Sequence, residues 1–449
     1  MLTALFRAFR TPDLRRKLLF TLAIMAAYRF GAHIPLPGVN TANLAACTGA
    51  SSRSGTGNQA FGLLNLFSGG ALLQLSIFAL GITPYITASI ILQLLTVVIP
   101  RLETLKNDGQ AGQAKITQYT RYLTIGLSVL ESTMTLTAAR NNPAYLLGQR
   151  CQGVAVLYPT VTWEGMAVLV VVMTAATSLL MWLGELVTDR GVGNGMSVLM
   201  FTSIAARFPG SLWTIKSDSH TLDGWPVFAA VLVLGMLTVA AVVFVEQGQR
   251  RIPVQYSKRM VGRRAYGGTS TYIPLKLNQS GVVPVIFASS LLQMPTMAVG
   301  LTGGAQATKG WQGWVNRHFT PTIHGYPMVY TVSYLLLILA FAFFYMSIAF
   351  DTVQIADTMK QYGGFVPGIR AGRPTIEYLG YVSTRITWPG ALYLAVIAAI
   401  PMVALDRLHA SASFPFGGTT ILIMVGVGLE TVKQIESQLQ QHHYEGFLR

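Results

Sequence analysis

The stretch of residues 61–100 constrains the fold most, because it is apolar enough to enter a lipid bilayer and yet is broken twice. The Ser-Gly-Gly run at 68–70 interrupts it first, and Gly81 and Pro84 interrupt it again. A simple membrane anchor would be one unbroken run of about 20 apolar residues. Inside a bilayer, irregular backbone occurs only against protein or a water-filled cavity, because its polar groups need hydrogen-bond partners. The segment therefore predicts a short half-helix followed by a spanning helix, both beside a pore or transport path.

Composition places the whole chain in a membrane. Only 11% of the 449 residues are charged and 52% are hydrophobic, whereas soluble domains carry about 25% charged residues. Apolar runs of bilayer-spanning length predict about ten spans. They lie near 17–36, 75–98, 118–138, 165–186, 194–208, 226–246, 282–299, 328–350, 389–405 and 417–435. We therefore expect an all-α polytopic membrane protein, with the first run retained as a helix rather than cleaved as a signal peptide.

Arginine and lysine predict the orientation of these spans, because loops on the cytoplasmic side are enriched in them. The N-terminus is strongly basic ahead of the first apolar run, and ten spans return the C-terminus to the same cytoplasmic side. Two of the inside loops, 247–280 and 351–388, are long, basic and interleaved with tyrosine. Their charge fits either ordinary membrane topology or a docking surface for an anionic cytoplasmic partner.

Distinctive motifs are spread in order over nearly the whole chain. The first half carries IPLPG at 34–38, LFSGGALLQLSIFALGITPYITASIILQLLTVV at 66–98, GQAGQAKITQYTRYLT at 109–124 and MWLGELVTDRGVGNGMS at 181–197. The second half carries FVEQGQRRIPVQYSKRMVGRRAY at 244–266, STYIPLKLNQSGVVPVIFASS at 270–290, GGFVPGIRAGRPT at 363–375 and FGGTTILI at 416–423. Together they resemble the SecY family, the central subunit of the bacterial Sec protein-translocation channel, and in particular its actinobacterial members.

The resemblance implies two pseudo-symmetric halves, each of five spanning helices, around a central pore. The N-terminal half would be residues 1–215, with the first five spans and a plug at about 61–70. The C-terminal half would be residues 216–449, with the other five spans and both long basic loops. The apolar runs divide in the same five-plus-five way.

In this family a broken half-helix plugs the outer side of the pore, and a ring of apolar side chains narrows its middle. The plug residues here would be Phe61, Leu64, Leu66, Phe67, Ser68, Gly69 and Gly70. The glycine pair and the Gly/Ser-rich loop 48–60 favour a mobile plug, although a fixed re-entrant element is the alternative. The ring would be Ile82, Ile86, Met196, Met200, Ile286 and Ile423. Such a ring excludes water and ions by dewetting, and flexible methionine suits a variety of passing chains.

The resemblance implies two further sets of residues. A docking surface for the SecA motor ATPase or the ribosome would contain Lys258, Arg259, Arg263, Arg264 and Arg370. Contact with ribosomal RNA there would be a salt-dependent phosphate interaction. A lateral gate for signal peptides would open between the spans 75–98 and 282–299, with Gln93, Asn278 and Gln279 as its polar residues. Ordinary hydrogen bonds between helices are the alternative role for these three residues.

The implied function is a protein-conducting channel subunit of the bacterial cytoplasmic membrane. It would translocate unfolded secretory polypeptides and release membrane segments laterally into the bilayer, with SecE and SecG as further subunits. A secondary transporter is the alternative, but it needs a midplane ion or substrate site, and Glu131 is the one acid near the middle of a predicted span. The sequence has no HExxH motif and no GxxxxGK[ST] loop. We therefore expect no enzymatic activity, no cofactor and no metal, with energy supplied by a partner.

The two cysteines, Cys47 and Cys151, are too few for a disulfide framework. Both lie in predicted outer loops, where a disulfide can form. They would either pair and restrain the plug-bearing loop or remain free.

Overall fold

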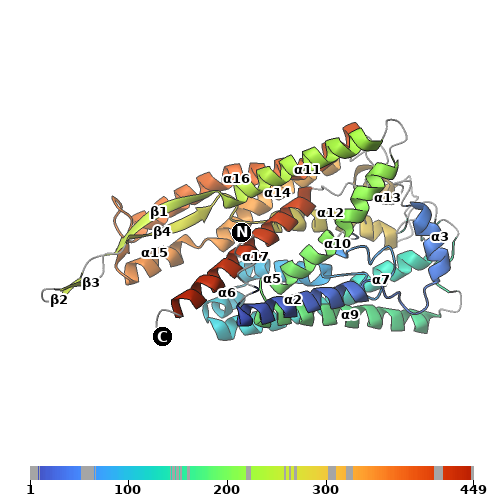
Figure 1. Ribbon diagram of the computed structural model, residues 1–449, viewed down its shortest axis with the longest axis horizontal. Helices are drawn as coiled ribbons and strands as arrows, with labels where there is room; N and C mark the ends of the chain where they lie inside the picture. The colour runs from blue at the N-terminus through green and yellow to red at the C-terminus, as the bar shows by residue number, and fades with distance from the viewer. Residues whose placement is uncertain are drawn as a thin grey trace.

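A computed structural model shows an elongated, largely helical molecule (Figure 1). It describes residues 9, 11–51, 65, 67–141, 143, 147, 151, 154–158, 162–218, 224–256, 259–261, 264–266, 270–301, 310–319, 327–408 and 418–445. Each of the ten predicted apolar runs overlaps one helix. These helices are α2 (Pro12–Gly31), α5 (Thr83–Val98), α7 (Gln110–Asn141), α9 (Trp163–Arg190), α10 (Gly195–Asp218), α11 (Gly224–Gln247), α12 (Val283–Leu301), α14 (Met328–Ala349), α16 (Arg373–Leu408) and α17 (Gly418–Glu445). Shorter helices in the described part are α3 (Thr41–Ser51), α6 (Pro100–Asn107), α13 (Gly310–Phe319) and α15 (Thr352–Gln361).

The helices differ in hydropathy, and therefore in how clearly their sequences indicate membrane spans. Within the described ranges, three helical stretches are long and apolar enough by themselves: Trp163–Arg190, Met328–Gln361 and Arg373–Ile400. A fourth is the pair Thr83–Val98 and Pro100–Lys106, which is bent by 106°. Helices such as α7 bury small hydroxyl residues instead, and Thr124 and Ser132 bond to carbonyl oxygens one turn earlier at 2.7 and 2.6 Å. Small, internally bonded side chains lower the hydropathy of a helix while they allow close packing inside a membrane protein.

The predicted spanning helix at 75–98 is shorter than the sequence indicated. Residues 71–82 form a series of turns, and α5 begins only at Thr83. Leu75 and Gly81 have positive φ angles of 43° and 56°, which a helix cannot contain. Ile77 N–H also bonds to the carbonyl of Ile34 at 2.9 Å, so backbone groups that a helix would use are already paired with the IPLPG segment. Pro84 then lies in the first turn of α5, where proline is tolerated.

The loop predicted at 247–280 is a β-structure. Strand β1 (Gln249–Tyr256) pairs antiparallel with β4 (Ser270–Lys276), and Ile252 lies opposite Ile273. Beyond them, β2 (Arg259–Val261) pairs with β3 (Arg264–Tyr266) at one extreme end of the molecule, opposite to α3 and α13 (Figure 1). Alternate residues of β1 are buried, as a sheet with one covered face requires.

The loop predicted at 351–388 is also ordered, and much of it is helical. Asp351 caps α15 by accepting bonds from the N–H groups of Val353 and Gln354, both at 3.0 Å. Strand β5 (Gly364–Phe365) pairs with β1, so the sheet order is β4-β1-β5. The ninth predicted span, at 389–405, is longer than expected, because α16 begins at Arg373 rather than near 389. One hydrophobic cluster, which includes Ile252, Met359 and Leu379, contains residues from both segments that were predicted as loops. The two segments therefore form one structural unit.

Three large hydrophobic clusters form most of the core of the helical body, and a smaller one contains Leu14, Val192 and Ile435. One draws all its buried members from the chain between Leu36 and Met173, and a second draws its buried members from between Val242 and Leu422. The third combines residues from both parts, from Ile24 to Val427. Division of the chain at 215/216 stays a prediction, and the third cluster is the place where the two proposed halves meet.

Candidate pore constriction, plug and docking surfaces

All six predicted ring residues belong to the third cluster. Ile82 lies at the start of α5 and Ile86 one turn later, whereas Met196 and Met200 lie on α10. Ile286 on α12 and Ile423 on α17 complete the set from the other part of the chain. Five of the six are at most 7% exposed, and Ile86 is partly buried. The structure therefore brings together apolar side chains from residue 82 to residue 423 in one buried cluster, and their role as a constriction stays a prediction.

A glycine on α9 makes room for one ring residue. A Cβ atom on Gly184 would overlap Sδ of Met196, and a Cβ atom on Gly195 would overlap the carbonyl oxygen of Gly184. The two helices α9 and α10 therefore approach closely only because neither position carries a side chain. Sδ of Met196 therefore occupies the space that a side chain at position 184 would fill.

Of the predicted plug residues, Phe61, Leu64 and Leu66 lie outside the described residues. Phe67 is helical and buried, and it belongs to the same hydrophobic cluster as the ring. The turn at 68–70 follows it directly, with φ angles of +66° and +94° at Gly69 and Gly70. The described end of the predicted plug therefore lies against the predicted ring.

Of the predicted docking residues, Lys258 and Arg263 lie outside the described residues. Arg259 is on β2 and Arg264 on β3, at the end of the molecule (Figure 1). Arg370 is exposed in the turn between β5 and α16, where its carbonyl oxygen accepts a 2.9 Å bond from the Thr375 hydroxyl. Because β5 pairs with β1, the turn of Arg370 belongs to the same sheet-based unit as the hairpin.

The predicted gate residues do not share one environment. Gln93 is exposed on α5, which contacts α12. Asn278 is buried, and its Nδ2 donates to Oε1 of Glu246 at 2.6 Å and to the carbonyl of Gly281 at 3.2 Å. Asn278 thus ties the segment ahead of α12 to the end of α11, and its role at a gate stays a prediction. Oε1 of Gln279 is buried without a hydrogen-bond partner among the described atoms.

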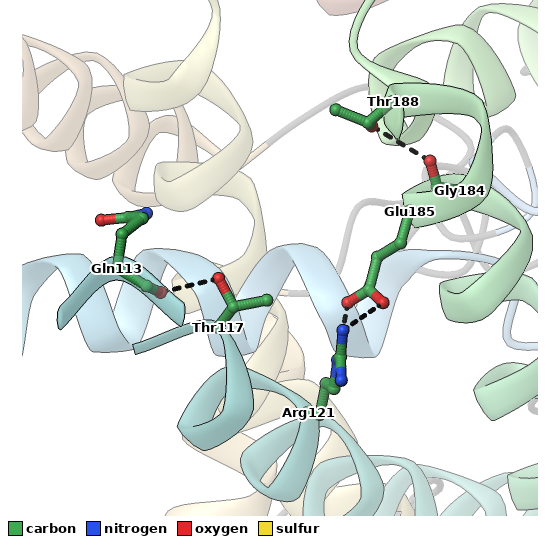
Figure 2. A network of polar contacts seen from close by, with 6 residues as sticks. All are labelled: Gln113, Thr117, Arg121, Gly184, Glu185 and Thr188. Atoms are coloured by element: carbon green, nitrogen blue, oxygen red, sulfur yellow. Dashed lines mark hydrogen bonds and ion pairs between the residues drawn. The ribbon is translucent and has the colours of Figure 1, made fainter. Parts of the chain in front are cut away.

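An ion pair that sequence reasoning missed joins α7 to α9. Arg121 donates from Nε and Nη2 to the two carboxylate oxygens of Glu185, at 2.9 and 2.8 Å (Figure 2). Nearby hydroxyls of Thr117 and Thr188 bond to carbonyls of their own helices. The sequence did indicate that such a pair exists, because an arginine inside the apolar run 118–138 needs a partner of opposite charge.

The alternative that both cysteines are free is wrong. Cys151 is fully buried and disulfide-bonded. Cys47, the only other cysteine of the sequence, lies in α3.

The fold defines a multi-spanning helical membrane protein in which two groups of helices meet at an apolar cluster. Comparison with known proteins identifies it more closely. The SecY family profile matches residues 76–432. Protein translocase subunit SecY of Streptomyces galbus is 61% identical over 450 residues, and that of Mycobacterium tuberculosis (strain H37Rv) is 52% identical over 456, with 100% of each chain covered. The chain belongs to the SecY family.

Solved structures show the same fold at much lower identity. A structure of a protein-conducting channel matches with a TM-score of 0.64 and 17% identity, and Sec61 from a canine ribosome–channel complex matches with 0.62 and 16%. Each match covers 94% of this chain and 91% of the other. A third match, with a TM-score of 0.61 and 18% identity over 94% of this chain and 91% of the other, is a SecY channel whose plug domain stabilises the closed state and maintains a membrane seal.

Proposed function

We propose that this chain is the pore subunit of a protein translocase. It conducts unfolded secretory polypeptides across the cytoplasmic membrane and releases membrane segments sideways into the bilayer. The observation that carries the proposal is the single apolar cluster that gathers Ile82, Met200, Ile286 and Ile423 from both parts of the chain, with Phe67 packed in it. Membership of the SecY family supports the same function, and it does not favour a secondary transporter.

The proposed constriction works through its lack of polar groups. A narrow apolar ring is unfavourable for water and ions, so it stays dry when no polypeptide is present. Met196 and Met200 are unbranched, and their side chains can adapt to different residues of a passing chain. Ring and plug together keep the membrane sealed, and the plug moves away when a polypeptide enters.

The proposed partners follow from charge and from the relatives. Arg259 and Arg264 lie on the β2–β3 hairpin, and Arg370 lies in the turn after β5. This basic region docks the SecA motor or the ribosome. Among the fold relatives, canine Sec61 was solved in a ribosome–channel complex. The curated relatives are translocase subunits, and SecE and SecG are the companions that we propose here. Signal peptides enter between α5 and α12.

The proposed topology places this docking end and both termini in the cytoplasm. The basic residues of the N-terminus and of the docking unit support this orientation, because lysine and arginine accumulate on the cytoplasmic side. Residues 1–215 and 216–449 are the two proposed halves around the pore.

Site-specific crosslinking from a stalled secretory precursor tests the channel. Photoreactive residues are placed at Ile82, Ile86, Met200 and Ile423, with Leu336 as the control because it is 62% exposed on α14. We expect strong crosslinks at the ring positions and none at Leu336. Absence of crosslinks at every ring position, in membranes that still export the precursor, would show that the polypeptide does not pass here.

A further inference from the structure

The turn at residues 68–70 is bound from one side by α2. Nη1 of Arg29 donates a 2.9 Å hydrogen bond to the carbonyl oxygen of Gly69. The neighbouring hydroxyl, that of Tyr28, donates a longer bond of 3.4 Å to the carbonyl oxygen of Ser68. Two consecutive carbonyls of the turn therefore accept from two consecutive residues of one helix. The bond from Arg29 is the stronger of the two, because it is shorter and its donor is charged.

The same turn also packs against α10. A Cβ atom on Gly69 would lie 3.1 Å from the Cα atom of Ser203, and one on Gly70 would lie 3.2 Å from Nε of Arg207. Both glycines have positive φ angles, which other residues rarely adopt. Any other residue at these two positions would therefore strain the backbone of the turn and crowd α10.

Both arginines lie against the turn, Arg29 at Gly69 and Arg207 at Gly70. No acidic side chain among the described residues forms an ion pair with Arg29 or Arg207. A charged group inside a membrane protein needs polar partners, and here a backbone carbonyl of the turn supplies one. If the turn moved away, the Arg29 guanidinium would lose this hydrogen-bond partner. The free-energy cost of that loss stabilises the turn in the position that the structure shows.

The turn is also a self-contained unit. The carbonyl oxygen of Asn65 accepts from the N–H of Gly70 at 2.9 Å and from the hydroxyl of Ser68 at 3.2 Å. Leu72 N–H donates to Oγ of the same serine at 3.2 Å. These internal bonds keep the turn folded when it separates from Arg29, so the turn can move as one body.

We propose that Arg29 is a plug-retaining residue, which with Arg207 clamps the base of the plug onto the ring of the resting channel. This inference rests on the proposed role of the segment 61–70 as a plug. Phe67 is held in the ring cluster as long as the clamp is closed. Entry of a polypeptide breaks the bond to Gly69 and lets the turn leave.

The test measures how accessible the plug base is in the idle channel. Phe67→Cys is introduced into the complete translocase complex, and the rate of its labelling by a membrane-impermeant maleimide is followed from the outer side without precursor. Adding Arg29→Gln should raise this rate about tenfold, because a lost charge-assisted hydrogen bond shifts an equilibrium by roughly that factor. Arg29→Lys should restore most of the slow labelling. Arg16→Gln, exposed on the cytoplasmic turn of the same helix, is the matched control and should change nothing.

Two further measurements show which part of the proposal fails if the expected result is not obtained. The first is the labelling rate of Phe67→Cys with Arg207→Leu, which should also increase. The second is export of a precursor by the Arg29→Gln complex, because normal export would exclude misfolding as the cause of faster labelling. Equal labelling of Arg29→Gln and the parent, with ring crosslinks intact, would overturn the clamp and leave the channel standing. Faster labelling without ring crosslinks would support the clamp and overturn the conducting path.

Discussion

Arg121 and Glu185 face each other across α7 and α9 and form a two-pronged ion pair, with nitrogen–oxygen distances of 2.9 and 2.8 Å (Figure 2). The carboxylate side chain is 19% exposed and the guanidinium side chain 48% exposed. The pair therefore joins two helices of the N-terminal part at a place where the carboxylate has limited access to water.

Arg121→Met should destabilise the protein by about 1–3 kcal/mol, because it leaves the Glu185 carboxylate largely enclosed and unpaired. Replacing both residues, in Arg121→Met with Glu185→Leu, should cost clearly less. Thermal unfolding of the purified variants in detergent, followed by tryptophan fluorescence, measures both effects. Equal losses in the single and the double variant would contradict an unpaired carboxylate as the cause.

Gly195→Ala should destabilise the protein by about 1–3 kcal/mol, because the new methyl group overlaps the backbone carbonyl oxygen of Gly184, which cannot turn aside. A methyl group on Gly184 would meet only Sδ of Met196, which can move, so the backbone overlap at position 195 is the sharper test. The same unfolding measurement applies. Gly126→Ala is the matched control: Gly126 is exposed on α7 with no atom within 4 Å of an added Cβ, so this change should be neutral or slightly stabilising. An equal loss in both alanine variants would rule out the overlap.

Arg370→Ala should reduce motor-driven translocation about tenfold or more, which is the effect of losing a central charged contact in an interface. Arg373→Ala is the matched control, because Arg373 is also exposed but already pairs with Glu377 at 3.4 Å. Export of a precursor into membrane vesicles by purified motor, at two salt concentrations, gives the comparison. A similar loss in both variants would mean that general positive charge, rather than Arg370, supports docking.

Hydropathy and motif spacing were sufficient to predict the helical architecture. Each apolar run became a helix, and the six ring residues that family resemblance indicated belong to one cluster. The same reasoning misplaced the start of α5, because the pairing of residues 75–77 with the distant segment 34–36 competes with helix formation. Hydropathy does not report such long-range backbone bonds.

The contacts of individual polar residues were harder to predict. Asn278 was assigned to the gate from its position before an apolar run, yet its amide bonds to Glu246 on the preceding helix. The partner of Arg121 is 64 residues away, and no local pattern selects Glu185 over other acids. Likewise, the two residues of β5 carry too little sequence signal to predict a pairing with β1 more than a hundred residues earlier.

That short pairing has a mechanical consequence. Strand β5 is hydrogen-bonded to β1, and the chain continues from β5 into α16 after a short turn. A pulling force on the projecting hairpin is therefore transmitted to the first residues of α16, a helix of 36 residues. An ideal α-helix of this length is about 54 Å long, but Pro389 lies inside α16 and removes one of its backbone hydrogen bonds. A force on the hairpin would therefore bend α16 most easily at Pro389, which makes this proline a natural hinge between the β-structure and the rest of the helix.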